Sequence, residues 1–306
     1  MSISRLANTR NFNLRHYIHV ARFVRWPLNL FLIPGFVLAI VVSKQYTQLY
    51  NPIIILAVIS LCFSAFANYT INEFLDAKFD ALHPEKKFRP GAQGLLQLPY
   101  IVAQYLLFII VSLTLAWMVN PRFALWIGIF QMMGICYNVN PIRTKDKPYL
   151  DILSESVNHP LRFICGWTVL SNVTFPPIPL LIACWMAGAF LMTIKRYAEY
   201  RHINNAKIIQ QYRASFKYYN ENKLLVLAAF FSLTSTLFLG GYFMQSHFFL
   251  LYTFPFYAVL FAWYTYIGMM KNSPAQHPED LYKRQPYFVY YVAFLTIFTL
   301  ILFFVR

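Results

Sequence analysis

The chain has 306 residues and a formal net charge of +15, with 26 Lys and Arg against 11 Asp and Glu. Hydrophobic residues make up 58% of it and charged residues only 12%, whereas soluble domains carry about 25% charged residues. This composition excludes an ordinary soluble domain and predicts a protein embedded in a lipid bilayer. The sequence contains no Gly-rich nucleotide loop, redox motif or nucleic-acid module, so we expect no nucleic-acid partner.

Nearly uncharged stretches of about 17–25 residues mark candidate membrane-spanning helices. Nine such stretches occur, at residues 26–43, 52–71, 98–119, 122–138, 149–171, 176–194, 224–243, 248–270 and 286–305. The sequence therefore predicts an all-α, polytopic membrane protein built as a nine-helix bundle. Residues 1–25 are polar and basic and lack the apolar core of a signal peptide. We expect them to form a cytoplasmic segment before a single transmembrane domain at 26–306.

Basic residues gather on one side of the predicted bundle. With nine spans, all Lys and Arg lie on the side of the N-terminus or at its edge, except Lys44, Arg122, Arg162 and Arg306. The positive-inside rule then places the N-terminus in the cytoplasm. The 11 carboxylates lie on or near the same side, which favours a polar reaction chamber open to the cytoplasm. A transporter would need charged sites that are accessible from both sides, and the nearly bare outer side argues against that function.

The second span leads directly into a stretch rich in carboxylates. On a continuing helix, one face presents Asn72, Asp76 and Asp80 at i, i+4 and i+8, with Glu73 beside them. Like charges this close repel unless a cation bridges them, and hard oxygen ligands suit Mg²⁺. The cations that follow are placed to meet phosphate oxygens: Lys86, Lys87 and Arg89. A solvated helix end is the alternative interpretation.

The fifth span carries a polar stripe about three turns long. Its members fall at i, i+4, i+7, i+8 and i+11: Asp151, Glu155, Asn158, His159 and Arg162. Each charge inside a membrane costs about 2.5–3.5 kcal/mol, so the stripe should face a protein-lined cavity, unless it forms a structural network of its own. Arg162 is expected to pair with a substrate phosphate or with Glu155. Pro160 is expected to kink this helix.

The sixth span ends in a cluster with one acid and two cations, Lys195, Arg196 and Glu199. Arg offers a bidentate fork to phosphate and Lys a point charge. The cluster therefore predicts a direct phosphate clamp rather than a second metal site. The alternative interpretation is that these two cations only interact with anionic lipid at the membrane surface.

These motifs resemble those of a known family. The order Asn-acid-x-x-Asp-x-x-x-Asp, followed by His83-Pro84-x-Lys86-x-x-Arg89-Pro90, resembles the first aspartate motif of the UbiA superfamily of intramembrane prenyltransferases. Asp151-Ile-Leu with Leu161-Arg162-Phe-Ile-Cys-Gly166 resembles its phosphoribosyl-transferring branch. Lys195-Arg-Tyr-Ala-Glu199 resembles the decaprenyl-phosphate phosphoribosyltransferases of that branch. Family members usually carry Asp where this chain has Glu73.

Two further segments extend the resemblance. Tyr137-Asn-Val-Asn140-Pro141-x-Arg143-x-Lys145 closes the fourth span as the superfamily does, and its cations are candidates for phosphate binding. Arg22, Trp26 and Asn29 match the Arg-Pro-x-x-Trp-x-Lys-Asn opening of the branch, whereas Leu28 stands in place of its lysine.

The resemblance implies an Mg²⁺-dependent transferase, with Glu73, Asp76 and Asp80 as metal ligands and Asn72 beside them in the catalytic group. The expected substrate-binding residues are Arg22, Asn29, Asn68, Lys86, Arg89, Tyr137, Lys145, Asp151, Glu155, Arg162, Lys195, Arg196 and Glu199. The implied reaction moves a pentose from phosphoribosyl pyrophosphate, or a related sugar donor, to a polyprenyl phosphate in a bacterial inner membrane. Two alternatives stay open: a transferase that uses a prenyl diphosphate and a small or aromatic acceptor, and a lipid-phosphate transporter or inactive lipid-binding relative.

Overall fold

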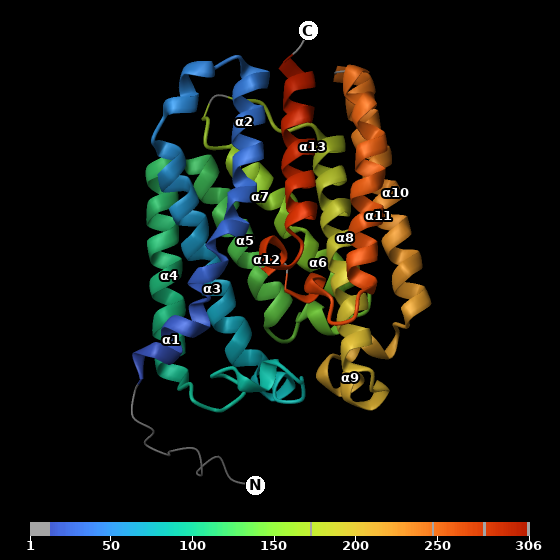
Figure 1. Ribbon diagram of the computed structural model, residues 1–306. Coiled ribbons are helices and arrows are strands. Elements are labelled where there is room, and N and C mark those ends of the chain that lie inside the picture. Colours follow the sequence, from blue (N-terminus) through green and yellow to red (C-terminus); the bar gives the residue numbers. More distant parts are fainter. Residues whose placement is uncertain (1–12, 172, 247, 278–279, 305–306) are drawn as a thin grey trace.

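A computed structural model describes residues 13–171, 173–246, 248–277 and 280–304. Within these residues every regular element is a helix and no strand occurs. The long helices run side by side as one bundle (Figure 1). Of the predicted segment 1–25, residues 1–12 lie outside the described residues. Residues 14–21 form α1, and a 3₁₀ turn begins at Phe23. Both belong to a candidate membrane span, Leu14–Ser43, that starts earlier than predicted. The all-helical class is thus confirmed.

The first part of the bundle contains α1 (Leu14–Ala21), α2 (Leu32–Ser43), α3 (Ile53–Asp80), α4 (Leu98–Val119), α5 (Pro121–Asn138), α6 (Leu150–Ser156) and α7 (Asn158–Trp167). The second part contains α8 (Ile178–Ile203), α9 (Ala206–Tyr212), α10 (Glu221–Ser246), α11 (Phe254–Met269), α12 (Leu281–Arg284) and α13 (Pro286–Phe304). Short 3₁₀ turns lie between them, including η2 (Phe23–Phe31), η4 (Lys86–Phe88), η5 (Thr144–Asp146) and η6 (Ala214–Lys217). We call the end at which α3 and α8 finish the charged end (bottom of Figure 1).

Seven helical segments of the described chain are long and apolar enough to cross a membrane: Leu14–Ser43, Ile53–Asp80, Leu98–Val119, Ile178–Ile203, Glu221–Gln245, Phe248–Met269 and Pro286–Phe303. The predicted spans at 122–138 and 149–171 are not among them. Helix α5 contains the polar residues Arg122 and Gln131, and the stretch 149–171 is divided between α6 and α7. The protein is a multi-pass membrane protein, but the predicted count of nine spans is not confirmed.

The division of the fifth predicted span corrects the expectation of a continuous polar stripe. Helix α6 ends at Ser156 and α7 begins at Asn158. Pro160 lies in the first turn of α7, where its missing amide hydrogen leaves no helical hydrogen bond unmade. Two separate helices therefore present the polar residues of this region.

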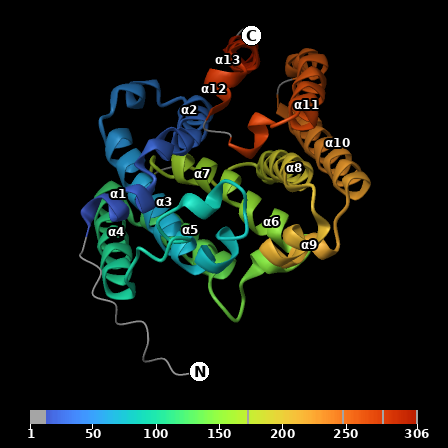
Figure 2. The ribbon, with the colours of Figure 1, turned by 60° about the horizontal axis from the view of Figure 1, so that its bottom comes forward.

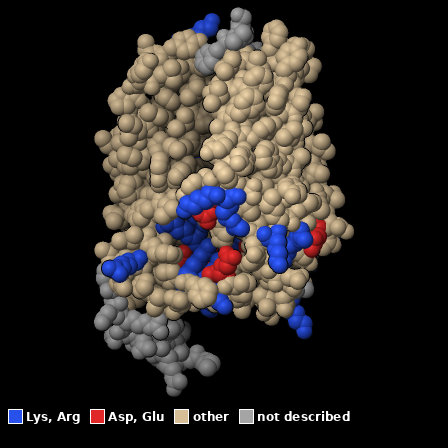
Figure 3. Space-filling view, in the orientation of Figure 1, with Lys and Arg blue, Asp and Glu red and all other residues tan. Residues whose placement is uncertain are grey.

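The outward-facing side chains of the long helices are apolar. Leu233 and Leu237 on α10 are 71% and 72% exposed, and helices that are hydrophobic on all sides belong in a membrane. Figure 3 shows the same pattern on one face, where tan side chains cover the upper part and most Lys, Arg, Asp and Glu gather in the lower part. The charges therefore concentrate at the charged end.

Helices α2 and α7 pack so closely that only glycine fits at two positions of their contact. A Cβ atom at Gly35 would lie 2.0 Å from the Phe163 carbonyl oxygen, and one at Gly166 would lie 1.8 Å from the Leu32 carbonyl oxygen. This contact fixes α7 against the N-terminal part of the bundle.

The broken pair α6 and α7 lies between α3 and α5 on one side and α8 on the other (Figure 2). The connection from α3 to α4 and helix α9 lie at the charged end. The C-terminal turns of α3 and α8 thus approach a common polar region inside the bundle.

Candidate active site

Two carboxylates at the end of α3 are paired with arginines from other parts of the chain. Glu73 is 1% exposed, and its Oε2 accepts a 2.8 Å hydrogen bond from Arg22 Nη2. Asp80 Oδ2 accepts a 2.7 Å bond from Arg89 Nη1. Arg22 lies at the end of α1 and Arg89 follows η4. Cations of the protein thus relieve the repulsion that the sequence predicts along this face.

The third carboxylate, Asp76, is paired with two cations from the segment after α5. Its Oδ1 lies 2.8 Å from Arg143 Nη2 and 2.6 Å from Lys145 Nζ. Lys145 also donates to Asn138 Oδ1 at 2.9 Å, and the same oxygen accepts a 2.5 Å bond from Asn72 Nδ2. Burial lowers the pKa of Lys145 to about 8, although the Asp76 charge acts in the opposite direction.

The donor atoms of this group suit a magnesium ion that a ligand also holds. Among the described residues, no group of three or more His, Cys, Asp or Glu side chains is arranged to hold a metal ion. Glu73 Oε1 is buried without any partner, and neither Asp76 Oδ2 nor Asp80 Oδ1 receives a hydrogen bond from the described residues. Mg²⁺ commonly binds one or two carboxylates together with substrate phosphates. The residues therefore fit such an ion, but not one held by protein atoms alone.

The acid at the end of α8, Glu199, is fully occupied by protein donors. Its Oε1 lies 2.5 Å from Lys86 Nζ and accepts a 2.9 Å bond from the Tyr212 hydroxyl. Its Oε2 accepts a 3.2 Å bond from Arg196 Nη1. Burial by itself lowers the pKa of Lys86, but the Glu199 charge raises it above its ordinary value. Lys86 follows α3 in sequence, so this ion pair joins the α3 and α8 parts of the site.

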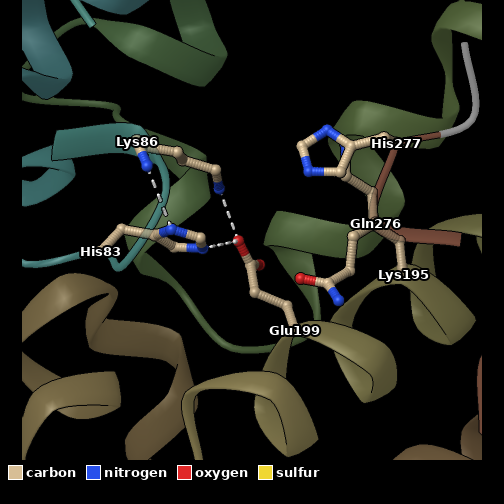
Figure 4. A pocket seen from close by; sticks show the side chains of 6 residues that line it. All are labelled: His83, Lys86, Lys195, Glu199, Gln276 and His277. Atoms are coloured by element: carbon tan, nitrogen blue, oxygen red, sulfur yellow. Dashed lines mark hydrogen bonds and ion pairs between the residues drawn. The ribbon is translucent and has the colours of Figure 1, made fainter. Parts of the chain in front are cut away.

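A small pocket lies beside this ion pair and is lined by His83, Lys86, Lys195, Glu199, Gln276 and His277. Lys195, Gln276 and His277 lie across the pocket from His83 and Lys86 (Figure 4). His83 Nε2 is 3.6 Å from Glu199 Oε1, and burial lowers the pKa of the imidazole. Lys195 forms no ion pair within 4 Å with any carboxylate of the described chain. The pocket therefore places the Lys195 amine beside Glu199, without a described carboxylate partner.

Arg196 is fixed by protein acceptors on all of its nitrogens. Besides Glu199, it donates to Asp151 Oδ2 at 3.4 Å and to the Tyr137 hydroxyl at 3.3 Å. Asp151 is completely buried and also accepts bonds from the Ser215 hydroxyl at 3.0 Å and the Tyr219 hydroxyl at 2.6 Å. Both residues were expected to bind substrate; their contacts hold helices and a loop together.

Arg162 lies deeper in the bundle and has no acidic partner among the described residues. Its Nε donates to Asn29 Oδ1 at 3.3 Å and its Nη1 to the Asn158 carbonyl at 3.4 Å, and its guanidinium lies 5.2 Å from the Phe130 ring centre. The expected pair with Glu155 is not formed. The two residues lie on different helices because the fifth span is broken.

Two more expected site residues lie in the same interior. Asn68 Oδ1 is buried without a partner and packs against Gly134 of α5. Glu155 is half-buried, forms no ion pair within the described chain, and acts electrostatically on Tyr137 and Lys195.

An opening near the charged end leads into this polar interior. Figure 3 shows Lys and Arg side chains around it with Asp and Glu inside, and a hollow lined by uncharged side chains above it. The charged opening suits a phosphate group, and the uncharged hollow beside it leaves room for the remainder of a phosphorylated lipid.

The structure also brings in residues outside the set of expected substrate-binding residues. Arg143 binds Asp76, and Asn138 accepts the Lys145 hydrogen bond. Both belong to the quoted motif at 137–145, in which Arg143 is already a candidate for phosphate binding, and Asn138 could have been selected from it as well. Arg213 reaches the Tyr137 hydroxyl at 3.3 Å from a loop that has no helical periodicity to reveal it. Lys87, in contrast, is exposed and lies over the Phe88 ring.

Comparison with known proteins places these features in a wider group. A sequence model described as the UbiA prenyltransferase family matches residues 31–284. Decaprenyl-phosphate phosphoribosyltransferase of Mycobacterium tuberculosis H37Rv is 31% identical over 157 residues, which are 49% of this chain and 50% of the relative. The Corynebacterium glutamicum protein of that name is 30% identical over 148 residues, 47% of this chain and 42% of its own. The chain thus spans about half the length of the curated relatives it matches.

Solved structures share the whole architecture. A UbiA homologue from Archaeoglobus fulgidus bound to DMAPP and Mg²⁺ has a TM-score of 0.69 and 17% identity, covering 95% of this chain and 100% of its own. The same homologue bound to GPP and Mg²⁺ gives a TM-score of 0.68, again with 17% identity, over 92% of this chain and 99% of that chain. At this identity the likeness shows the fold alone.

Proposed function

The chain belongs to the UbiA prenyltransferase family, and on this premise we propose that it transfers a phosphoribosyl-type pentose from its diphosphate to a polyprenyl phosphate. It is a transferase by family. The proposal adds the two substrates, both of which carry phosphate, and assigns one half of the site to each.

The end of α3 is the proposed binding site for the donor diphosphate. Glu73, Asp76 and Asp80 would hold Mg²⁺ through their oxygens that lack a protein donor. The bound ion would supply charge neutralisation for the departing diphosphate. Lys145 and Arg89 already lie against these carboxylates, where they can contact phosphate oxygens.

The contacts of Glu199 are the main observation in support of a polyprenyl phosphate as the acceptor. Both of its oxygens are bound by protein donors, so α8 offers no second carboxylate site for a metal-bound diphosphate. Lys195, which pairs with no carboxylate of the described residues, lies next to it. A single anionic phosphate group suits a cation-rich site of this kind better than a metal–diphosphate complex does.

In the proposed step, the bond between C1 of the pentose and the diphosphate oxygen breaks, and the diphosphate leaves with the bonding electrons. An oxygen of the polyprenyl phosphate supplies the electron pair of the new bond to C1. That oxygen carries no proton at neutral pH in the dianion, so the step needs no general base. The residues that surround the site orient the two phosphates and stabilise the charge that develops on the leaving group.

A second candidate is transfer of a prenyl group from its diphosphate to a small acceptor. It is favoured by Leu28, which stands in place of the lysine expected near a sugar-donor phosphate. The solved UbiA homologue that shares this fold was bound to DMAPP in one structure and to GPP in another.

The two functions differ in the lipid product. Purified protein in lipid nanodiscs is given Mg²⁺ and either phosphoribosyl pyrophosphate with a polyprenyl phosphate, or a prenyl diphosphate with an aromatic acceptor. Mass spectrometry should detect a pentose phosphate attached to the lipid phosphate in the first mixture. A prenylated acceptor from the second mixture, with no product from the first, would overturn the proposal in favour of the second candidate.

We also propose that the charged end faces the cytoplasm of a bacterial inner membrane. The Lys and Arg residues concentrate at this end, which the positive-inside rule assigns to the cytoplasm. A sugar donor dissolved in the cytoplasm would then reach the same end of the bundle as the ion-paired carboxylates.

A further inference from the structure

Arg213 has no carboxylate partner within ion-pair distance in the described chain, although its surroundings are largely protein. Its Nη1 donates to the Tyr137 hydroxyl at 3.3 Å. Its Nε is buried and has no hydrogen-bond acceptor. A buried donor without a partner is unfavourable, so an acceptor supplied by a ligand would stabilise this arrangement.

The position of Arg213 connects the two halves of the site. On the α8 side its guanidinium lies 5.9 Å from the ring centre of Tyr212, whose hydroxyl donates to Glu199. On the α3 side its partner Tyr137 has Lys145 Nζ 5.8 Å from its ring centre, and Lys145 pairs with Asp76. Arg213 does not come within 4 Å of the carboxylate oxygens of Asp76 or Glu199, so it forms an ion pair with neither. A guanidinium between the two halves can reach a phosphate held by either of them.

The loop that carries Arg213 is held in place by Asp151. The Ser215 and Tyr219 hydroxyls donate to Asp151 Oδ2 and Oδ1 at 3.0 Å and 2.6 Å. The Tyr219 oxygen also accepts a 2.6 Å bond from the Tyr149 amide at the start of α6. The loop following α9 is therefore fixed to α6 two residues after Arg213, which limits where the guanidinium can lie.

From these contacts we propose that Arg213 is a phosphate-binding residue of this site and that Asp151 is its positioning residue. This role of Arg213 rests on the proposed function in one respect, because it assumes that the ligand is a phosphorylated substrate. The shared chemistry is an anionic phosphate oxygen, which comes either from the donor diphosphate or from the lipid phosphate. Asp151 itself touches protein donors and acts through the loop.

The test measures binding without turnover, by calorimetry on purified protein with two probes: Mg²⁺–pyrophosphate and a short prenyl phosphate. Arg213→Gln should weaken at least one probe by roughly tenfold or more, as expected for a lost charge-assisted hydrogen bond. Arg213→Lys should bind more tightly than Arg213→Gln. The matched control is Lys217→Gln, which removes an exposed cation from the same loop and should bind like wild type.

The probe that weakens identifies the source of the phosphate. Loss confined to pyrophosphate assigns Arg213 to the donor, and loss confined to prenyl phosphate assigns it to the acceptor. Unchanged binding of both probes by Arg213→Gln, or the absence of binding of either probe by wild type, overturns the proposal.

A double-mutant cycle tests the positioning role of Asp151. Asp151→Asn should weaken the same probe as Arg213→Gln, and adding it to Arg213→Gln should produce little further loss. Additive losses would show that Asp151 acts independently of Arg213. Thermal unfolding of each variant identifies one that fails to fold, in which case Ser215→Ala, which removes only one anchoring hydroxyl, takes its place.

Failure of this inference is distinguishable from failure of the proposed function. A protein that binds pyrophosphate through Arg213 but transfers no pentose would contradict the proposed function and leave the role of Arg213 intact. A protein that transfers pentose equally well with Arg213→Gln would contradict only the role of Arg213.

Discussion

Within the described part of the chain, each carboxylate at the end of α3 has one oxygen bound by cations and one that receives no protein donor. The ion pairs balance four cations against four carboxylates: Arg22, Arg89, Arg143 and Lys145 against Glu73, Asp76, Asp80 and Asp146. Mg²⁺ alone would add two uncompensated charges to these buried surroundings, which is unfavourable. A diphosphate that arrives with the ion supplies the missing negative charge.

We therefore expect divalent metal to bind only together with a diphosphate. Electron paramagnetic resonance can follow Mn²⁺ as a substitute for Mg²⁺, since the sharp signal of the free ion broadens when the ion is bound. Purified protein should leave this signal unchanged until pyrophosphate is added. In Asp80→Asn the signal should stay largely that of free ion and turnover should fall by roughly 100-fold or more. Tight Mn²⁺ binding without pyrophosphate would contradict the charge argument.

Glu73→Asp provides a matched control for this measurement. It keeps the carboxylate and shortens its side chain by one methylene, so Mn²⁺ binding with pyrophosphate should be retained. Loss of binding in Glu73→Asp but not in Asp80→Asn would show that the metal ligands are wrongly assigned.

Lys145 should give the site a pH dependence. Burial lowers its pKa to about 8, so the ammonium form, which can attract phosphate, is present below that pH and is lost as the pH rises through it. We expect KM for the diphosphate substrate to increase above about pH 8 while kcat changes less, because bound phosphate stabilises the charged form.

Lys145→Arg tests the assignment of this pH effect, because arginine stays charged across the whole range. The rise in KM should move to higher pH by at least one unit in this variant. An unchanged profile in Lys145→Arg would assign the titration to another group. KM measured from about pH 6.5 to about pH 9.5 covers both cases.

At the scale of whole elements, the sequence is most informative where one helix carries the pattern. The spacing of Asp76 and Asp80 predicts a helix that continues past the apolar run, and α3 extends unbroken to Asp80. The same reasoning fails for 149–171. Spacing along an assumed unbroken helix places Arg162 and Glu155 on one face, whereas the chain starts a new helix just before Pro160, the residue expected to kink this span.

The α2–α7 contact gives a prediction about packing. Gly35→Ala would place a methyl group against the Phe163 carbonyl, at a calculated 2.0 Å from its oxygen. The helices would have to separate, and overpacking of this kind costs about 1–3 kcal/mol. Thermal unfolding in detergent should therefore show a lower midpoint for Gly35→Ala.

The control for this prediction is Gly128→Ala in α5. A Cβ atom at Gly128 meets nothing within 4 Å, so this variant should unfold at or above the wild-type midpoint, since alanine favours helix. Equal destabilisation of both variants would mean that close α2–α7 packing is not the cause.

For the whole molecule, composition and loop charge predict the fold class well. They do not predict which side chains of the site form ion pairs with one another. The apolar helices and the charged end follow from hydropathy and the distribution of Lys and Arg. The ion pair of Lys86 with Glu199 joins residues 113 positions apart, and no local pattern encodes such a distance. The hydrogen bond from Arg213 to Tyr137 joins residues 76 positions apart, so the sequence does not predict this contact either.

The charge distribution predicts the orientation of the molecule. Single cysteines replacing Asn205 and Asn272, near the charged end, should be labelled only from the cytoplasm. A cysteine replacing Tyr50, which is 90% exposed at the opposite end, should be labelled only from outside. The background must lack the four native cysteines. Labelling of Asn205→Cys from outside would reverse the orientation and remove the argument for a cytoplasmic sugar donor.

Pyrophosphate release tests the central claim of two phosphorylated substrates meeting in one site most directly. Purified protein in nanodiscs with Mg²⁺ should release pyrophosphate from phosphoribosyl pyrophosphate only when a polyprenyl phosphate is also present, and EDTA should stop the release. The account would be contradicted if the protein ignored the sugar donor under all conditions and released pyrophosphate from a prenyl diphosphate when given an aromatic acceptor.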